Sequence, residues 1–420
     1  MKHKALITAI LAALLLVSCN TITSHQSPDD ALGGASPLVL IEEDEPLLYE
    51  LLEELPQEEA QPIELSAEMT LAAHSEQTEA PQEPAVGMTS ETADDHTSTE
   101  LRSSEPSQEP SSPDEPPAPR IVQITISAVG DCIPGNEPRS DGDPRYPNYM
   151  MRATGDYGHF FRGVQDIFAS DDLTIANLEG VLSTCTDKAE GIYHHRGDPE
   201  NIRAFSESSV EVLNLANNHT GDFLDQGYAD TVETVTSAGI ICVEDGGVSY
   251  TEVKGIKIAL VGNCYNNGAI DLIGRIREEA DLVIFMMHCG DMNTYAPNQL
   301  QINKARWAIA SGADLVLGHH PHVLQPLDEY MGKRIVYSLG NFSYGGTCAL
   351  GDYDTMIYQQ TFTFIDGELS DGIDDRIIPC SVSSSSEVND YRPTPYAPGS
   401  AQLKAFWEKF DAINAGEYGG

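Results

Sequence analysis

The chain has 420 residues, with 66 acidic and 23 basic side chains, eight cysteines and a net charge of −43. So acidic a chain lacks the basic stripe that neutralises phosphates, which argues against duplex or single-stranded nucleic acid as a partner and against polyanions in general. The charge is unevenly divided, because residues 20–120 carry 24 acids and two arginines, whereas 29 of the 30 aromatic residues lie after position 120. We therefore expect only the second part of the chain to build a core.

The first nineteen residues have the composition of an export signal. Two lysines precede an apolar run at residues 5–17, which is too short for a membrane-spanning helix. The string LVSC at 16–19 resembles a bacterial lipobox, in which the cysteine is lipidated and becomes the new N-terminus. We expect a lipoprotein signal peptide at 1–19, lipidation at Cys19 and a position on the extracytoplasmic face of the cell membrane. An ordinary signal peptide or an uncleaved anchor is the alternative.

Residues 20–120 are rich in Glu, Pro, Ser, Thr and Gln. Such a segment cannot bury enough apolar surface to offset its chain entropy, so we expect a disordered acidic linker. Repulsion between its charges would extend it and hold the folded domain away from the membrane. The string LLYELLEEL at 47–55 has helical spacing, which suits a short amphipathic helix, a docking peptide or a transient helix in a solvated tether.

The remaining 300 residues suffice for one large α/β domain at 121–380 and a peripheral C-terminal segment at 381–420. Short apolar runs predict buried strands at 121–129, 173–176, 210–216, 256–262, 282–287 and 315–317. An antiparallel portion is expected from 323–327, 335–338 and 357–364, with a turn at 331–333. Helical spacing indicates helices around 160–168, 228–235 and 403–410.

Polar side chains follow the predicted strands. In open α/β sheets ligands gather at the carboxyl ends of strands, and the residues found there are Asp131, Glu179, Asn218, His219, His288, His320 and His322. Taken singly, each is explained by a cap, a turn or a structural histidine. Together they form a mixed nitrogen and oxygen donor set that suits Mn, Fe or Zn. Pro321 favours extended geometry in its predecessor, which would turn the imidazoles of His320 and His322 to the same side.

The order of several strings resembles a known family. These strings are ISAVGD, ANLEG, LANNHTGDFLDQG, HCGD and GADLVLGHHPHVLQPLDEYMGKRIVYSLGNF. They are similar, over about residues 121–365, to the CapA family of capsule-synthesis proteins, which includes the PgsA subunit of poly-γ-glutamate synthesis. That family in turn resembles the calcineurin-like metallophosphoesterases. The resemblance implies a four-layer α/β/β/α sandwich with a two-metal centre at the sheet ends.

The resemblance also implies roles for the polar residues. Asp131 and His322 would bind the first metal, and Glu179 would stand at the bridging position. The second metal would be held by Asn218, His288 and His320, and His219 would be the general acid or the electrostatic partner of the leaving oxygen. Two divalent ions about 3.5–4 Å apart can activate a hydroxide for attack on a phosphoryl or acyl centre.

The sequence departs from the family pattern at several positions. Metallophosphoesterases usually have a histidine two residues after the first aspartate, and Ile133 stands there, so the first metal would be short of a ligand. Glutamate replaces the bridging aspartate at position 179, and Cys289 and Asp291 stand where many relatives have Trp and Glu. These changes are compatible with metal binding and put phosphatase turnover in question.

Two further residues have open roles. Arg196 follows two histidines and could bind an anionic carboxylate or phosphate of the substrate, or belong to a loop surface. Asn341, in the string SLGNF, could line the pocket or form a turn, and we do not count it among the ligands.

We expect an exported, lipid-anchored protein of capsule or poly-γ-glutamate synthesis or processing, with hydrolase-type chemistry at a divalent-metal site. The alternative is a non-catalytic accessory subunit of a membrane polymer synthase that keeps the metal site for structure or binding. The expected partners are polyglutamate synthase subunits or an envelope polymer. Direct binding of polyglutamate to so acidic a domain would require bridging ions or a local basic patch.

Overall fold

The computed structural model describes residues 118–191, 193–266 and 268–418. The predicted signal peptide, Cys19 and nearly all of the predicted linker lie outside the described residues. Within those three ranges, no helix combines the length and the apolar character needed to cross a membrane.

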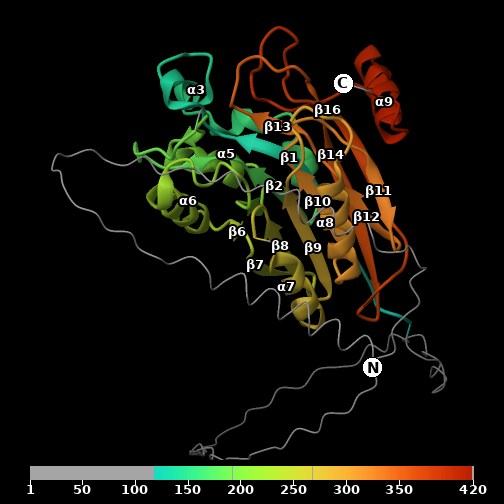
Figure 1. Cartoon of the computed structure of the whole chain (residues 1–420). Helices are drawn as coiled ribbons and strands as arrows, with labels where there is room; N and C mark the ends of the chain where they lie inside the picture. Colours follow the sequence, from blue (N-terminus) through green and yellow to red (C-terminus); the bar gives the residue numbers. More distant parts are fainter. Residues whose placement is uncertain (1–117, 192, 267, 419–420) are drawn as a thin grey trace, which may run out of the picture. The chain divides into compact units, whose positions relative to one another are not determined.

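The described residues form two large mixed β-sheets and a short two-stranded ribbon (Figure 1). The nine-stranded sheet contains β1 (Ile121–Ile133), β2 (Leu173–Leu178), β5 (Val212–Asn214), β6 (Ile241–Val243), β13 (Asn341–Tyr344), β14 (Asp354–Ile365), β15 (Glu368–Leu369), β16 (Asp375–Ser381) and β17 (Thr394–Pro395). The six-stranded sheet contains β7 (Val248–Val253), β8 (Ile256–Asn263), β9 (Leu282–His288), β10 (Leu315–His319), β11 (Leu327–Tyr330) and β12 (Lys333–Val336). The ribbon pairs β3 (Val181–Leu182) with β4 (Arg196–Gly197).

Helices connect and cover the strands. The α-helices are α3 (Pro147–Thr154), α4 (Gln165–Phe168), α5 (Arg203–Ser206), α6 (Leu224–Ser237), α7 (Gly268–Ile276), α8 (Gln299–Ala310) and α9 (Ala401–Asn414). Short 3-10 helices occur at Pro138–Ser140, Tyr157–Phe160, Pro199–Ile202 and Arg277–Glu279. Local capping fixes where two of the helices begin: Asn298 and Gln301 form a capping box at α8, and the Ser400 hydroxyl accepts from the Leu403 N–H at α9.

Each sheet has a parallel centre whose strands end at one edge. In the first sheet β1, β2, β5 and β6 are parallel neighbours, and in the second β8, β9, β10 and β12 are. Every residue of β2 and of β9 is buried, as expected for strands covered on both faces. Antiparallel strands complete both sheets, because β14 pairs with β1 and β11 pairs with β12 through the predicted turn. In each sheet, the residues that follow the parallel strands therefore lie together at the edge formed by the carboxyl ends of those strands.

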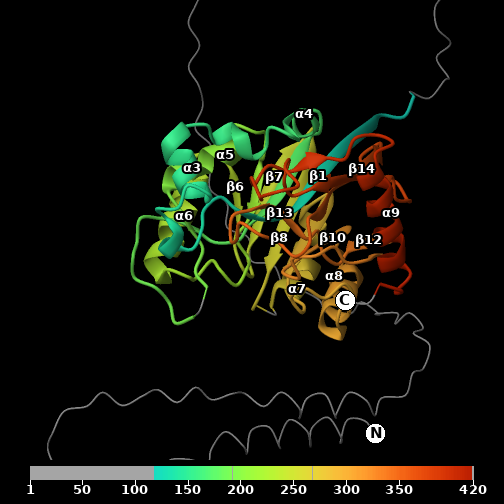
Figure 2. The ribbon, with the colours of Figure 1, turned by 90° about the horizontal axis from the view of Figure 1, so that it is seen from above.

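Three buried clusters define four layers. One lies between the sheets and joins residues such as Ile126 of β1 to Ile284 of β9. A second lies on the outer face of the first sheet, where Val235 of α6 is buried, and a third packs α7 and α8 on the second sheet. Figure 2 shows α3, α5 and α6 on one side of the strands and α7 and α8 beside the other sheet. The expected α/β/β/α sandwich is confirmed.

Two expected elements differ from the structure. The predicted helix at 160–168 is instead the end of a 3-10 helix (Tyr157–Phe160), a turn and the short helix α4. In that turn Gly163 packs on the Pro393 carbonyl oxygen, which would lie 2.3 Å from a Cβ at this position. Residues 323–326 form no strand: Leu324 makes only an isolated bridge to Leu339, and the Gln325 side chain donates to the carbonyl oxygens of the 294–296 loop. Their apolar spacing reflects burial rather than regular pairing.

The C-terminal segment is not peripheral, contrary to expectation. The predicted helix is present as α9, and its Phe406, Phe410 and Ile413 are buried in the cluster between the sheets. The Asn414 side chain accepts a hydrogen bond from the Leu327 N–H, at the start of β11. The helix therefore closes one side of the inter-sheet core.

We predict that Phe410→Ala lowers the free energy of unfolding of the full-length protein by about 3–5 kcal/mol, because it removes a buried aromatic ring from the inter-sheet core. Chemical denaturation checks this value. Lys404→Ala on the same helix is the control, since Lys404 is 79% exposed and its loss should cost within about 0.5 kcal/mol. Equal effects of the two changes would contradict the core role of α9.

Candidate metal centre

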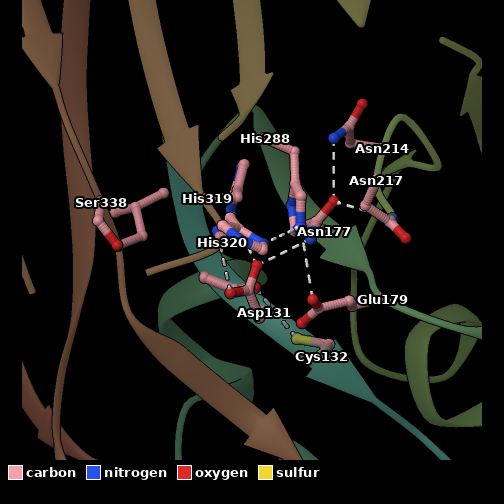
Figure 3. A network of polar contacts seen from close by, with 12 residues as sticks. Asp131, Cys132, Asn177, Glu179, Asn214, Asn217, His288, His319, His320 and Ser338 are labelled. Atoms are coloured by element: carbon pink, nitrogen blue, oxygen red, sulfur yellow. Dashed lines mark hydrogen bonds and ion pairs between the residues drawn. The ribbon is translucent and has the colours of Figure 1, made fainter. Parts of the chain in front are cut away.

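Donor side chains from both sheets meet at the carboxyl ends of their strands (Figure 3). Asp131 lies near the end of β1, and Glu179 directly follows β2. From the second sheet, His288 ends β9 and His320 directly follows β10. The structure thus brings together residues that are up to 189 positions apart in the sequence.

Asp131 is fixed by contacts on both of its oxygens. Its side chain is fully buried, its Oδ1 accepts a hydrogen bond from Asn177 Nδ2 at 2.8 Å, and its Oδ2 lies 3.2 Å from His322 Nδ1. The backbone N–H of Asp131 donates to the Gly340 carbonyl at 2.9 Å. The carboxylate is therefore held in one orientation toward His322.

Glu179 is a fully buried carboxylate whose two oxygens have no hydrogen-bond partner among the described residues. Two imidazoles lie near it: His288 Nε2 is 3.4 Å from Oε1, and His322 Nδ1 is 3.7 Å from Oε2. An unpartnered buried carboxylate is strongly unfavourable unless it is paired or coordinates a metal ion.

The second half of the cluster centres on His288. Its Nε2 lies 2.6 Å from Asn218 Oδ1 and 3.2 Å from His320 Nδ1. With Glu179 Oε1 at 3.4 Å, two oxygens and one imidazole nitrogen surround a single ring nitrogen that has at most one proton to donate. An ion shared by these donor atoms would satisfy all of them.

The donors form two groups that share Glu179. In one, ligand atoms of Glu179, His288 and His320 lie within 4.8 Å of one another, and in the other those of Asp131, Glu179 and His322 do. This division agrees with the bridging position that the resemblance gave to Glu179. The shared, unpartnered carboxylate and the mixed nitrogen and oxygen donors fit divalent metal ions.

The backbone of the GHHPH segment is not extended, contrary to expectation. His320 has φ 98° and His322 has φ 60°, both in the left-handed region that a non-glycine residue seldom occupies. The two imidazoles do converge on the cluster, but the turn rather than strand alternation aims them there. Strained backbone of this kind costs about 1–3 kcal/mol per residue and concentrates at functional sites.

The ionisation states follow from burial and from neighbouring charges. Burial raises the pKa of Asp131, but the adjacent His319 and His322 outweigh it and hold that pKa well below its usual value. Burial and the Asp131 charge oppose ionisation of Glu179, yet His322 and His288 lower its pKa. Burial opposes protonation of His322, and the two carboxylates nevertheless raise its pKa to about 9. A metal ion bound here would have to displace that proton.

His219, the predicted general acid, lies beside the cluster and is oriented by Asp222. Its Nδ1 is 2.8 Å from Asp222 Oδ2. Burial lowers the pKa of His219, but this hydrogen bond and the charge of Glu179 outweigh it and raise the pKa above its usual value. The His219 ring lies 4.3 Å from that of His195, centroid to centroid, and burial followed by the His219 charge lowers the pKa of His195 to about 3.

Both terminal nitrogens of the Arg196 guanidinium contact other residues of the protein. Its Nη2 lies 3.0 Å from Asp141 Oδ2 and its Nη1 donates to the Cys185 carbonyl at 2.6 Å. The guanidinium also lies over the Phe223 ring at 5.3 Å. These contacts tie Arg196 to the surrounding loops, and its role as a substrate contact stays a prediction.

Three residues near the ligands were not predicted as ligands, and for one of them, Asn341, a place in the pocket or in a turn was left open. Asn177 bonds to Asp131, and Asn341 Oδ1 lies 3.0 Å from His322 Nδ1. His319 Nδ1 lies 3.4 Å from Asp131 Oδ1, and neither of its ring nitrogens has a hydrogen-bond partner among the described residues. Asn177 could have been found from its position two residues before Glu179, whereas nothing in the sequence distinguishes His319 from an ordinary strand residue.

The sequence profile of the family described as "Bacterial capsule synthesis protein PGA_cap" matches residues 125–271 and 263–345, which together span more than half of the chain. The chain belongs to this family. The matched ranges include Asp131, Glu179, Asn218, His288, His320 and His322.

Two curated relatives support the assignment. The chain is 30% identical over 232 residues to the "PGA biosynthesis protein CapA" of Bacillus subtilis, which covers 48% of this chain and 61% of the relative. It is 29% identical over 256 residues to the "Capsule biosynthesis protein CapA" of Bacillus anthracis, covering 52% and 59%. The matched part thus spans about three fifths of each relative. Among solved structures, TT1561 of Thermus thermophilus aligns at 11% identity and a TM-score of 0.33, covering 56% of this chain and 94% of that one.

The left-handed backbone of His320 can be tested by comparing two variants that both lack the imidazole. We predict that His320→Gly is more stable than His320→Ala by about 1–2 kcal/mol, because only the alanine keeps a Cβ at positive φ. Denaturation of both full-length variants in the presence of a chelator measures the difference. Equal stabilities would show that the turn is not strained.

Proposed function

We propose that this PGA_cap protein acts in capsule or poly-γ-glutamate synthesis or processing, and that its buried cluster binds two divalent metal ions for hydrolase-type chemistry. The observation that carries the proposal is Glu179, a fully buried carboxylate without hydrogen-bond partners among the described residues that is shared by two groups of donors. The names of the two Bacillus relatives support the biological setting. The mixed donor set favours Mn, Fe or Zn.

Different residues of the cluster would bind the ions and donate the proton. Asp131, Glu179 and His322 would hold one ion, and Glu179, His288 and His320 the other, with Asn218 beside it. Bound ions would supply Lewis-acid polarisation of a phosphoryl or acyl oxygen. Asp222 fixes the His219 ring through Nδ1 and leaves Nε2 to donate a proton to the leaving oxygen.

The charge of the domain restricts how an anionic polymer could be bound. Residues 121–420 carry 42 acids against 19 bases, and among the described residues Asp131 and Glu179 form ion pairs only with histidines. Without bound cations the cluster would repel a polyanion. We therefore propose contact with one anionic group at a time, made through the ions, rather than a broad polymer-binding face.

We also propose that the protein is exported and anchored by a lipid on Cys19 at the extracytoplasmic face of the membrane, near a polymer synthase. The support is the lipobox-like string at 16–19. The acidic linker would then separate the domain from the membrane surface.

Metal analysis and hydrolysis assays of the purified full-length protein test the chemistry. We predict that the protein binds divalent metal, that His322→Ala lowers metal affinity at least 10-fold, and that His219→Ala keeps the metal but lowers kcat on a phosphodiester substrate by about 10²–10⁴-fold. His159→Ala is the matched control, because His159 Nε2 contacts the Asp390 carbonyl and takes no part in the cluster. A protein that binds no Mn, Fe or Zn would contradict the proposal, and one that binds metal without any turnover would favour the accessory-subunit alternative.

The anchor is tested by Cys19→Ser. We predict that the wild-type protein partitions into the detergent phase of a membrane extract and that the variant does not gain the lipid. Mass spectrometry of the N-terminal peptide gives the readout. An unmodified Cys19 in the wild-type protein would contradict the anchor.

A further inference from the structure

His195 has a buried polar atom that the fold does not use. The residue is 5% exposed, and its Nδ1 has no hydrogen-bond partner among the described residues. A buried donor or acceptor left unpaired costs about 1–3 kcal/mol, and such atoms are uncommon in folded proteins. Packing alone therefore does not explain why a histidine occupies this position.

The structural role of His195 is carried by its backbone. Its N–H donates to Asp222 Oδ2 at 2.6 Å, and its carbonyl accepts from the Val181 N–H at 3.0 Å. The first bond ties it to the carboxylate that orients His219, and the second to the strand that follows Glu179. Both bonds would survive replacement of the side chain, so the imidazole is free for another purpose.

Glycine at position 180 lets this backbone come close to Glu179. Gly180 has φ 145°, and a Cβ there would lie 3.0 Å from both the Cβ and the carbonyl oxygen of His195. A larger residue at this position would push the two segments apart. The backbone and Cβ of His195 thus pack against the loop that carries the shared carboxylate.

The ring of His195 belongs to a wall of three rings beside the metal-type cluster. Its centroid lies 4.3 Å from that of His219 and 6.3 Å from that of Tyr344. Tyr344 in turn lies 5.2 Å from the ring of His322, a proposed ligand. This wall therefore borders the proposed ion positions on the side where His219 stands.

We propose that His195 is a substrate-contacting residue, which uses its imidazole together with His219 to bind an anionic oxygen group placed at the metal centre. The inference rests on the proposed function, because the anion needs bound cations to overcome the charges of Asp131 and Glu179. The ligand chemistry is a compact oxyanion: a phosphate ester or the carboxylate of a γ-glutamyl chain.

Calorimetric binding of two probes to the Mn²⁺-loaded full-length protein tests the proposal. The probes are inorganic phosphate and γ-glutamylglutamate, which represent the two sources of the oxyanion. His195→Phe keeps a ring without polar nitrogens, and His195→Gln keeps a donor and an acceptor. We expect His195→Phe to lower the affinity for the probe about 10-fold and His195→Gln to keep an affinity within about 3-fold of wild type. Both variants should keep the wild-type metal content. His159→Phe is the matched control and should leave probe binding unchanged.

The outcomes separate this inference from the proposed function. Weakening of phosphate alone supports a phosphoester substrate, and weakening of the dipeptide alone supports a γ-glutamyl carboxylate. Unchanged binding in His195→Phe, loss of metal in both His195 variants, or a metal-loaded wild type that binds neither probe overturns the role of His195 and leaves the metal centre standing. A wild-type protein that takes up no metal overturns both.

Discussion

A carboxylate without hydrogen-bond partners among the described residues is the constraint on which the site depends. Glu179 follows a strand that is buried on both faces, so its carboxylate cannot turn to solvent. The histidines around it come from the second sheet and from the turn after β10. Packing the two sheets face to face therefore also brings the negative charge and its neutralising groups together. The same packing builds the core and the cluster.

The sequence predicted the elements whose pattern depends on burial alone. The parallel strands were recognisable as continuous apolar runs, because they are covered on both faces. The polar residues of the site were recognisable because they come directly after these runs. The four-layer arrangement came from the family resemblance, since no periodicity tells which face of a strand meets the other sheet. The segment around Phe160 misled because buried aromatic residues have helical spacing in a 3-10 helix and a turn as well.

The site could be predicted as a set of donors but not as a geometry. Alternation in an extended segment would have aimed His320 and His322 to one side, whereas both residues have positive φ. His319 contacts Asp131 and His195 contacts Asp222, and both partners are distant in the sequence. A local sequence pattern contains no information about such contacts. The protein partners of Arg196 could not be predicted either, because Asp141 and Cys185 lie in loops without any recognisable pattern.

The position of β1 in the sheet has a consequence for how the protein is made. Its antiparallel neighbour β14 begins more than 200 residues later, and the carbonyl that fixes the Asp131 backbone belongs to Gly340. Contacts between residues so distant along the chain form slowly, because the chain loses conformational entropy on closing the loop before strand pairing stabilises it. Synthesis proceeds from the N-terminus, so Asp131 and Glu179 are complete long before their partners exist. The first sheet can close only after β14 has been made, and the inter-sheet core can be covered only after α9 has been made. Until then the two carboxylates of the site belong to a part of the chain that has no complete sheet to hold it.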